Sequence, residues 1–351
     1  MRTIICPFLL ASALSIAACG TEAGGLGSDS FGELQASLLK INGLRINGLR
    51  INGLRINGLR INGLRINGTT ISGIGISGSG QLVAIGSDGS LSPASSVADL
   101  QLEAPQADGS TVLLRIDSEQ QDAASGVYVY AVSHQDSKGK WQPACGKTGN
   151  DPILAVPMLG SYDLDSGSFT PSQDQLMFGC NDGALGKCAL WGYRPWEEKT
   201  ECQGSVCKQQ SMQPWHHACT RLVRADYCGD GVPHTRNGTS INVWDNMGVQ
   251  APASTDWDME AEWTTDGARC IRHTRWLKAD KKAALTDLEY IQRTCPDRLA
   301  SNQPTACGDS SSDFTSTVGY DVVPTLRRLL RNQSQGWLTG TGHDKKGNKD
   351  D

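Results

Sequence analysis

Two short stretches near the middle of the chain carry the residue types most often used for chemistry. In the first, His216 and His217 stand just before Cys219, and a cysteine paired with a histidine can act as a thiol nucleophile. In the second, Asp226 and Asp230 lie four residues apart in a glycine-containing segment. Two carboxylates in such a segment could bind Ca²⁺ through their oxygens or act as a hydrolytic acid–base pair.

Each of these hypotheses has a structural alternative. The spacing of Asp226 and Asp230 does not match an EF-hand loop, and Asp226 can instead accept backbone hydrogen bonds in a tight turn. We therefore predict no metal site and keep the two aspartates only as candidates. Zinc is disfavoured because Cys202 and Cys207 have no matching pair at zinc-finger spacing. Motifs of nucleophile elbows, zinc proteases and phosphate loops are missing from the sequence, so we predict neither catalytic residues nor a cofactor.

The first 19 residues predict export to the cell envelope. Arg2 precedes an apolar run from Ile4 to Ala18 that is too short to span a membrane, which is typical of a secretory signal. The run ends in small residues directly before Cys19, which resembles a bacterial lipobox. That resemblance implies cleavage by signal peptidase II before Cys19 and acylation of its thiol. The alternative is an ordinary signal peptide with a chance cysteine.

Cysteine usage favours a disulfide framework over a thiol site. The chain contains 12 cysteines, of which Cys6 lies in the predicted signal and Cys19 is the proposed lipid site. An even remainder in an exported chain predicts disulfides, and Cys219 is then oxidised and unavailable as a nucleophile. The pairing cannot be deduced from sequence alone. The predicted disulfide cysteines are Cys145, Cys180, Cys188, Cys202, Cys207, Cys219, Cys228, Cys270, Cys295 and Cys307.

The charge distribution excludes a nucleic-acid-binding main body. The net charge is −5, yet the segment 39–78 contributes only basic residues, so the remainder is distinctly acidic. A surface of that sign repels phosphates.

The segment 39–78 is an internal repeat with a period of five residues. Ile recurs every fifth position from Ile41 to Ile76, and Gly follows two places later each time. This period fits neither a helix nor a strand, but it fits a coil with four five-residue sides. The repeat resembles the pentapeptide-repeat family of quadrilateral β-helices, although Leu stands where that family prefers a small residue. The alternative is a repeat-slippage insert that is only partly ordered.

The repeat divides the chain into predicted segments. Residues 1–18 are the lipoprotein signal, 19–38 a flexible tether, and 39–78 the repeat spacer. A β-rich region follows over 79–338, containing a cysteine-rich domain at about 127–307. The polar residues 339–351 are predicted to be a disordered tail.

Short apolar runs separated by turn residues predict antiparallel strands from residue 79 onward. Leu82–Ile85 is one such run, and Leu100–Leu102 and Val112–Ile116 flank a turn containing Asp108-Gly109, which is typical of a hairpin. Val127–Val132 is strongly β-favouring.

Helix signals are few. Apolar residues at helical spacing predict a helix within Ala283–Cys295, stopped by Pro296, and Pro324 could open a short helix reaching Leu330. The predicted fold class is therefore mainly β: a disulfide-stapled antiparallel β domain with few short helices, preceded by a pentapeptide-repeat β-helix-like spacer.

Tryptophan is unusually frequent, with nine Trp against five Phe. The rings could form platforms for sugars or a partner, or they could pack against disulfides in the core, which we expect for most of them. Acidic residues alternate with Trp257 and Trp263, which predicts a strand with one apolar and one wet face. The candidates are Trp191, Trp196, Trp215, Trp244, Trp257, Trp263 and Trp276.

Three motifs together resemble a known family. Residues 225–228 spell ADYC, residues 192–196 spell GYRPW, and residues 216–221 spell HHACTR. This combination resembles the ADYC domain of exported proteins and lipoproteins of myxobacterial type, over roughly Val127 to Arg275. The resemblance implies an outer-membrane location and carries over no catalytic residue or cofactor.

Three functions stay open at this point. The first, which we expect, is a non-enzymatic cell-envelope lipoprotein with a structural or binding role. The second is a glycan- or peptidoglycan-binding module that uses exposed Trp, and the third is an envelope hydrolase with a carboxylate site near Asp226 and Asp230. The expected partners are a membrane, through the lipid on Cys19, and envelope proteins or glycans.

Overall fold

The structure is a computed structural model of the 351-residue chain. It describes short strands between residues 39 and 70, then residues 73–85, 91–93, 100–105, 111–163, 165–173, 175–203, 205–253, 257–276, 285–302, 307 and 329–334. The predicted signal, Cys19, the tether, the tail, Trp337 and most of the predicted Pro324 helix lie outside the described residues. Of that helix only its end is described, and Leu330 there lies in a strand.

The fold is mainly β, as predicted, and the strand pairs in its sheets are antiparallel. Three short helices interrupt the strands within the described residues. The helices are α2 (Ala184–Leu190), α3 (Gln213–Arg224) and α4 (Asp287–Thr294), with 3-10 turns η1 (Pro296–Arg298) and η2 (Ala300–Asn302). None of the described helices is both long and apolar enough to cross a membrane.

A nine-stranded sheet contains the predicted strands from Leu100 onward, whereas the predicted run Leu82–Ile85 lies in a smaller, three-stranded sheet. The two predicted runs Leu100–Leu102 and Val112–Ile116 pair as β10 and β11, and β12 follows on the other side of β11. In sheet order the strands are β4 (Leu59–Arg60), β19 (Gln175–Cys180), β16 (Ala155–Leu159), β12 (Tyr128–Gln135), β11 (Thr111–Gln121), β10 (Leu100–Pro105), β5 (Arg65–Ile66) and β6 (Thr69–Thr70), with β13 (Trp141–Pro143) beside β12.

A five-stranded sheet combines one early strand with four strands from later in the chain and packs against α3. Its strands in order are β1 (Leu39–Ile41), β22 (Ser240–Asp245), β25 (Leu330–Ser334), β23 (Met259–Thr264) and β24 (Gly267–Ile271).

The remaining strands form small sheets. These are β2 (Arg50–Ile51) with β3 (Leu54–Arg55), β7 (Gly73–Ile76) with β8 (Leu82–Ile85) and β9 (Leu91–Pro93), β14 (Lys147–Thr148) with β15 (Asp151–Pro152), β17 (Ser161–Tyr162) with β18 (Phe169–Thr170), and β20 (Glu198–Gln203) with β21 (Val206–Ser211).

The repeat supplies edge strands to both large sheets. Its residues Leu39–Ile41 pair with β22, and Leu59–Arg60 pair with β19. The residues between these short strands lie outside the described part of the chain, so the predicted quadrilateral coil stays a prediction.

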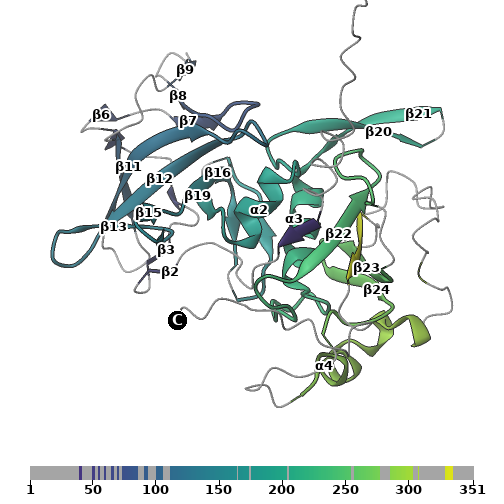
Figure 1. Ribbon diagram of the computed structural model, residues 1–351. Helices are drawn as coiled ribbons and strands as arrows, with labels where there is room; N and C mark the ends of the chain where they lie inside the picture. The colour runs from purple at the N-terminus through teal and green to yellow at the C-terminus, as the bar shows by residue number, and fades with distance from the viewer. Residues whose placement is uncertain are drawn as a thin grey trace, which may run out of the picture. The chain divides into compact units, whose positions relative to one another are not determined.

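Helix α2 connects the packing of the two large sheets. It contacts β16 and β19 of the nine-stranded sheet, and it contacts α3, which packs against the five-stranded sheet. Figure 1 shows α2 and α3 next to each other. The contact with β19 is very close, because a Cβ added at Gly186 would lie 2.5 Å from the carbonyl oxygen of Cys180. Position 186 therefore accepts no larger side chain without moving the helix.

All ten predicted disulfide cysteines are paired. The bonds are Cys145–Cys180, Cys188–Cys219, Cys202–Cys207, Cys228–Cys295 and Cys270–Cys307. The disulfide framework is thus confirmed, and it includes the cysteine of the thiol-nucleophile hypothesis.

The prediction of a wet face on the strand near Trp263 is wrong. Every residue of β23 is buried, including Glu260 and Glu262. Arg275 pairs with Glu260 and Arg331 pairs with Glu262, and both arginines are fully buried. The acidic residues face inward because cations from distant parts of the chain neutralise them.

Candidate functional site

Helix α3 carries the first predicted chemical stretch and ends at the second. Pro214 stands in its first turn, and Trp215, Ala218 and Leu222 face the core at helical spacing. The helix ends in a Schellman motif, since the amide of residue 225 donates to Leu222 and the amide of residue 226 donates to the carbonyl of residue 221. The ADYC turn is thus the C-terminal cap of a buried helix.

Ala225, the first letter of the motif, is the left-handed residue of this cap. It has a φ of 51° and is the one non-glycine residue with positive φ in the described part of the chain. This conformation costs an alanine about 1 kcal/mol or more. Its methyl group is fully buried in the core around α3, so burial offsets part of that cost.

Asp226, the second letter, is a buried counter-ion. Its carboxylate accepts from Nη1 of Arg221 at 2.5 Å and from the amide of Gly231, and Nη1 of Arg224 lies 3.7 Å away. Burial raises the pKa of the Asp226 carboxyl, and the charge of Arg221 opposes that shift. Burial also lowers the pKa of Arg224 to about 10. The Asp226 carboxylate thus balances the charge of buried arginines.

Tyr227, the third letter, ties the turn to the five-stranded sheet. Its hydroxyl donates to Oε1 of Glu260 at 3.0 Å and accepts from the amide of Arg275 at 2.7 Å. Its ring stacks on Trp263 with centroids 5.5 Å apart. Burial, followed by the charge of Glu260, raises the pKa of Tyr227 well above its ordinary value.

The pair of Glu260 and Arg275 closes this network. Both side chains are fully buried, and the guanidinium binds both carboxylate oxygens at 2.8 and 3.0 Å. The same guanidinium donates to the carbonyls of Leu222 and Val223, which lie in the last turn of α3. Burial raises the pKa of Glu260, but Arg275 outweighs it and holds the pKa below its ordinary value.

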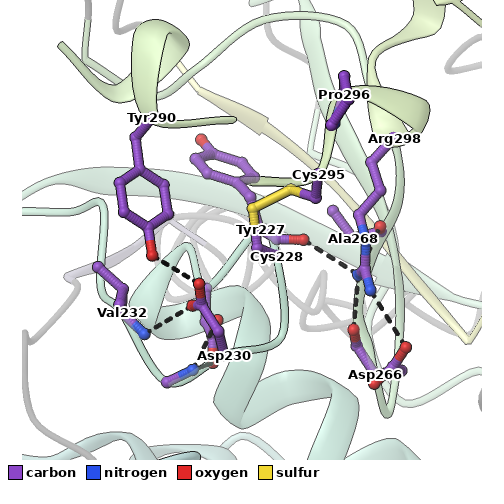
Figure 2. The surroundings of a disulfide bond; sticks show 12 residues. Tyr227, Cys228, Asp230, Val232, Asp266, Ala268, Tyr290, Cys295, Pro296 and Arg298 are labelled. Atoms are coloured by element: carbon purple, nitrogen blue, oxygen red, sulfur yellow. Dashed lines mark hydrogen bonds and ion pairs between the residues drawn. A yellow bond between two sulfur atoms is a disulfide. The ribbon is translucent and has the colours of Figure 1, made fainter. Parts of the chain in front are cut away.

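Cys228, the fourth letter, joins the turn to α4 through Cys295. Figure 2 shows the carboxylate of Asp230 next to this disulfide, where it accepts from the Tyr290 hydroxyl at 2.6 Å and from the amide of Val232 at 3.0 Å. On the other side of the disulfide, Arg298 donates to the carbonyl of Tyr227 and to the backbone and side chain of Asp266 in the β23–β24 turn. Asp226 and Asp230 therefore have different hydrogen-bonding partners.

The glycines of this loop are required by close backbone contacts. A Cβ added at Gly229 would lie 2.1 Å from the carbonyl oxygen of Asp266, and Gly229 has a φ of +72°. Any side chain there would displace the loop.

His216 is a core residue whose neutral imidazole ring is held by two hydrogen bonds. Its Nε2 lies 3.0 Å from the carbonyl of Leu185, so this nitrogen carries the proton, and its Nδ1 accepts from the Tyr162 hydroxyl at 3.0 Å. Burial lowers its pKa to about 4. Cys219 is disulfide-bonded to Cys188, as predicted, so it is not available for the alternative of a thiol dyad with His216.

His217 faces an open pocket beside the motif. The pocket has a volume of about 350 Å³ and is lined by residues of α3, of the segment around Phe169, and of the β23–β24 turn at Asp266. Nε2 of His217 donates to the carbonyl of Gly167, so Nδ1 is left as an acceptor. Burial, followed by the charge of Arg221, lowers the His217 pKa to about 3, and the ring is neutral at pH 7.

Arg221 connects the pocket to the ADYC turn. This residue lines the pocket, while its guanidinium binds Asp226 and the carbonyls of Ser166 and Thr265. Gln213 adds an amide at the opposite end of the helix. The motif thus fixes one wall of a cavity whose size lies at the lower end of the range for small-molecule sites.

The tryptophans do not form an exposed platform among the described residues. Four of them are buried, and four others are partly buried. Of the partly buried ones, Trp141 lies under Arg115, Trp196 donates to the carbonyl of Gly78, and Trp276 lies under Arg236. The buried set is Trp191, Trp215, Trp244 and Trp263.

Comparison with models of protein families identifies a family for this chain. The family model described as the ADYC domain matches residues 94–277, which is just over half of the chain. The chain therefore belongs to the ADYC domain family. The match begins upstream of the Val127 start that the motifs suggested, at the strands that precede β12. No curated protein and no solved structure matches the chain.

Sequence analysis missed the residues that complete the motif. Glu260, Arg275, Tyr290 and Arg298 lie 33 to 71 residues away from their partners in the ADYC turn. Their side chains show no local pattern. The one available signal was the excess of acidic residues around Trp263, which requires cations if the strand is buried. Within the described residues, no cluster of three or more potential ligands could hold a metal ion.

Replacing Asp226 by Asn should strongly destabilise the protein. The change keeps the shape of the side chain but leaves Arg221 and Arg224 as buried, unneutralised cations, which costs about 3–5 kcal/mol in comparable pairs. Urea unfolding measures the loss. The exposed Asp230→Asn variant, which can still accept from Tyr290, is the matched control and should lose less than about 1 kcal/mol. Equal losses in the two variants would show that the buried pair contributes no stability.

Acid should destabilise the fold through His216. In the unfolded chain this imidazole binds a proton at its ordinary pKa of 6.5, whereas in the folded protein it does so only near pH 4. The unfolded state therefore binds more protons between these values, and the free energy of unfolding falls as the pH drops through the window. The contribution is about 3 kcal/mol at pH 7.

The His216→Gln variant isolates this effect. Gln can still donate to the Leu185 carbonyl but does not titrate. Unfolding measured from pH 4 to pH 7 should give a lower stability at pH 7 and a shallower dependence on pH than the wild type. An unchanged slope would mean that His216 is protonated equally in both states.

Proposed function

We propose that this protein is a lipid-anchored cell-envelope lipoprotein whose ADYC domain is a non-catalytic binding module. The lipobox-like sequence before Cys19 supports the anchor, and the tether and the repeat spacer would hold the domain away from the membrane. The five disulfides suit the oxidising environment outside the cytoplasm. An outer-membrane location is the version of this proposal that we favour.

One observation carries the choice of binding over catalysis. The candidate catalytic groups all have structural partners: Asp226 binds arginines, Cys219 is oxidised, and His216 holds a backbone carbonyl. What the ADYC turn leaves accessible is the pocket beside α3, with an aromatic ring at Phe169 and polar groups around it. A pocket that combines an aromatic ring with a few polar groups is suited to holding a ligand.

Glycans of the envelope are the second, more specific candidate. Nδ1 of His217 and the carboxylate of Asp266 are acceptors, so they favour a ligand rich in hydroxyl or amide donors. The Phe169 ring and two prolines add apolar surface, on which the C–H face of a sugar can pack. The pocket replaces the exposed Trp platform as the place where a sugar would bind.

The anchor is tested by replacing Cys19 with Ala. We expect the full-length wild-type protein to fractionate with membranes and to show the mass of acyl chains on residue 19. The Cys19→Ala variant should lack that mass and leave the membrane fraction. Cys6→Ala, which changes a cysteine inside the predicted signal, is the matched control and should behave as the wild type. Equal release of both variants, or no acyl mass in the wild type, would contradict the proposal.

The binding role is tested with soluble peptidoglycan fragments and envelope oligosaccharides by isothermal titration calorimetry. We expect dissociation constants in the micromolar to millimolar range, and a loss of about 3- to 10-fold in His217→Phe and in Gln213→Ala, because each removes one hydrogen-bonding group. Gln142→Ala, on an exposed strand outside the pocket, should bind as the wild type. Binding that neither pocket variant weakens would place the site elsewhere, and no binding at millimolar ligand would refute a glycan ligand.

A further inference from the structure

One of the five disulfides differs from the others in its exposure. Cys202 and Cys207 are both solvent-exposed. In each of the other four bonds at least one cysteine is packed in a hydrophobic cluster, and the cysteines there are at most 9 % exposed except for the half-buried Cys295. A thiolate in solution can therefore reach the Cys202–Cys207 bond without any unfolding of the protein.

The exposed bond lies near the tip of an arm formed by β20 and β21. Figure 1 shows the two strands running together away from α2 and α3. The two cysteines stand directly opposite each other, with Cα atoms 4.1 Å apart, and only Gln203 and Val206 pair beyond them. Val206 at the tip is 53 % exposed.

The arm depends on this bond more than the rest of the fold does. Within the described residues, β20 and β21 pair only with each other, and a two-stranded ribbon is marginally stable by itself. The side chains of β21 are exposed apart from a half-buried Gln210. Side-chain contacts at the base tie the arm inward: Asn246 donates to the buried Glu201 at 2.5 Å, and the amide of Gln213 donates to Oγ of Ser211 at 3.3 Å.

The same bond contributes little to the body of the domain. It joins residues only five positions apart, whereas the other disulfides join residues 31 to 67 positions apart. A shorter loop restricts the unfolded chain less. Opening the bond would release the arm and leave α3, the ADYC turn and both large sheets under their own disulfides.

We propose that Cys202–Cys207 is a thiol–disulfide exchange site for a dithiol protein of the thioredoxin type, and that the exchange loosens the β20–β21 arm. A thiolate of the reductant attacks one sulfur of the bond, forms a mixed disulfide and expels the other sulfur as a thiolate, which takes up a proton. The second thiol of the reductant loses its proton and attacks the reductant's sulfur in the mixed disulfide, which expels the remaining arm cysteine as a thiolate that takes up a proton. The arm then holds two thiols, and the reductant holds one disulfide and has given up two electrons.

The test exposes the full-length folded protein separately to dithiothreitol and to reduced thioredoxin, with pulse alkylation and peptide mass spectrometry. We expect Cys202 and Cys207 to be alkylated at least 100-fold faster than the other eight disulfide cysteines with either reagent. Reduction of a buried disulfide at a similar rate would overturn the proposal. So would a pair that dithiothreitol opens but thioredoxin does not, because that result shows exposure without protein exchange.

Hydrogen exchange of the selectively reduced protein tests the consequence for the arm. Amides in 198–211 should lose protection, while those of α3 and β23 stay protected. Unchanged protection in the arm would refute the loosening.

The variant Cys202→Ser with Cys207→Ser is the control for the separability of the arm. It should show no fast-labelling thiol and keep the melting temperature within about 3 °C of the oxidised wild type. The matched variant Cys188→Ala with Cys219→Ala, at a buried bond, should melt distinctly lower. Equal melting losses in the two variants would mean that the exposed bond supports the whole domain, which contradicts a local switch.

Discussion

The structure depends on hydrogen-bond donors for the last backbone carbonyls of α3, which are buried. The last carbonyls of a helix have no partners within it, and in a dry environment each one needs a donor. Here the ADYC turn provides two backbone amides, and Arg275 reaches from beyond β24 to donate to Leu222 and Val223. The cation that Arg275 introduces requires Glu260, and Glu260 in turn holds the Tyr227 hydroxyl. One buried helix end thus explains three charged or polar groups in the core.

This constraint also explains why the motif looks chemical in the sequence. Asp226 has the residue type of a metal ligand or a general base, yet it balances the charge of Arg221 inside the protein. His216 resembles half of a nucleophilic dyad, yet it joins α3 to α2 through the Leu185 carbonyl. Buried polar residues must find polar partners, so a core rich in them collects the same residue types as an active site. Burial and partners, and not residue type, separate the two.

Much of the fold was predictable where the signal is local. The β10–β11 hairpin follows from apolar runs around a turn, α4 from its periodicity and its stop at Pro296, and the disulfide set from an even cysteine count. The rest depended on distant partners. Helix α3 was missed because cysteine, histidine and arginine interrupt its apolar face, and β25 was missed because its sequence Leu-Arg-Asn-Gln-Ser is polar but fully buried. The pocket was missed because three separate segments form it.

The parts with room for function are therefore those that the core does not use. Arg221 is held by Asp226 and two carbonyls, so the wall it gives to the pocket is rigid, and a ligand there would not have to order it. The β20–β21 arm has the opposite character, since its two strands pair only with each other among the described residues and an exposed disulfide joins them near the tip. A rigid pocket is suited to recognition of a fixed shape, and a weakly held arm is suited to a change of state. The disulfide lies near the tip of the arm, whereas the amide of the pocket residue Gln213 donates to Oγ of Ser211 at its base, so opening the bond should leave the pocket intact.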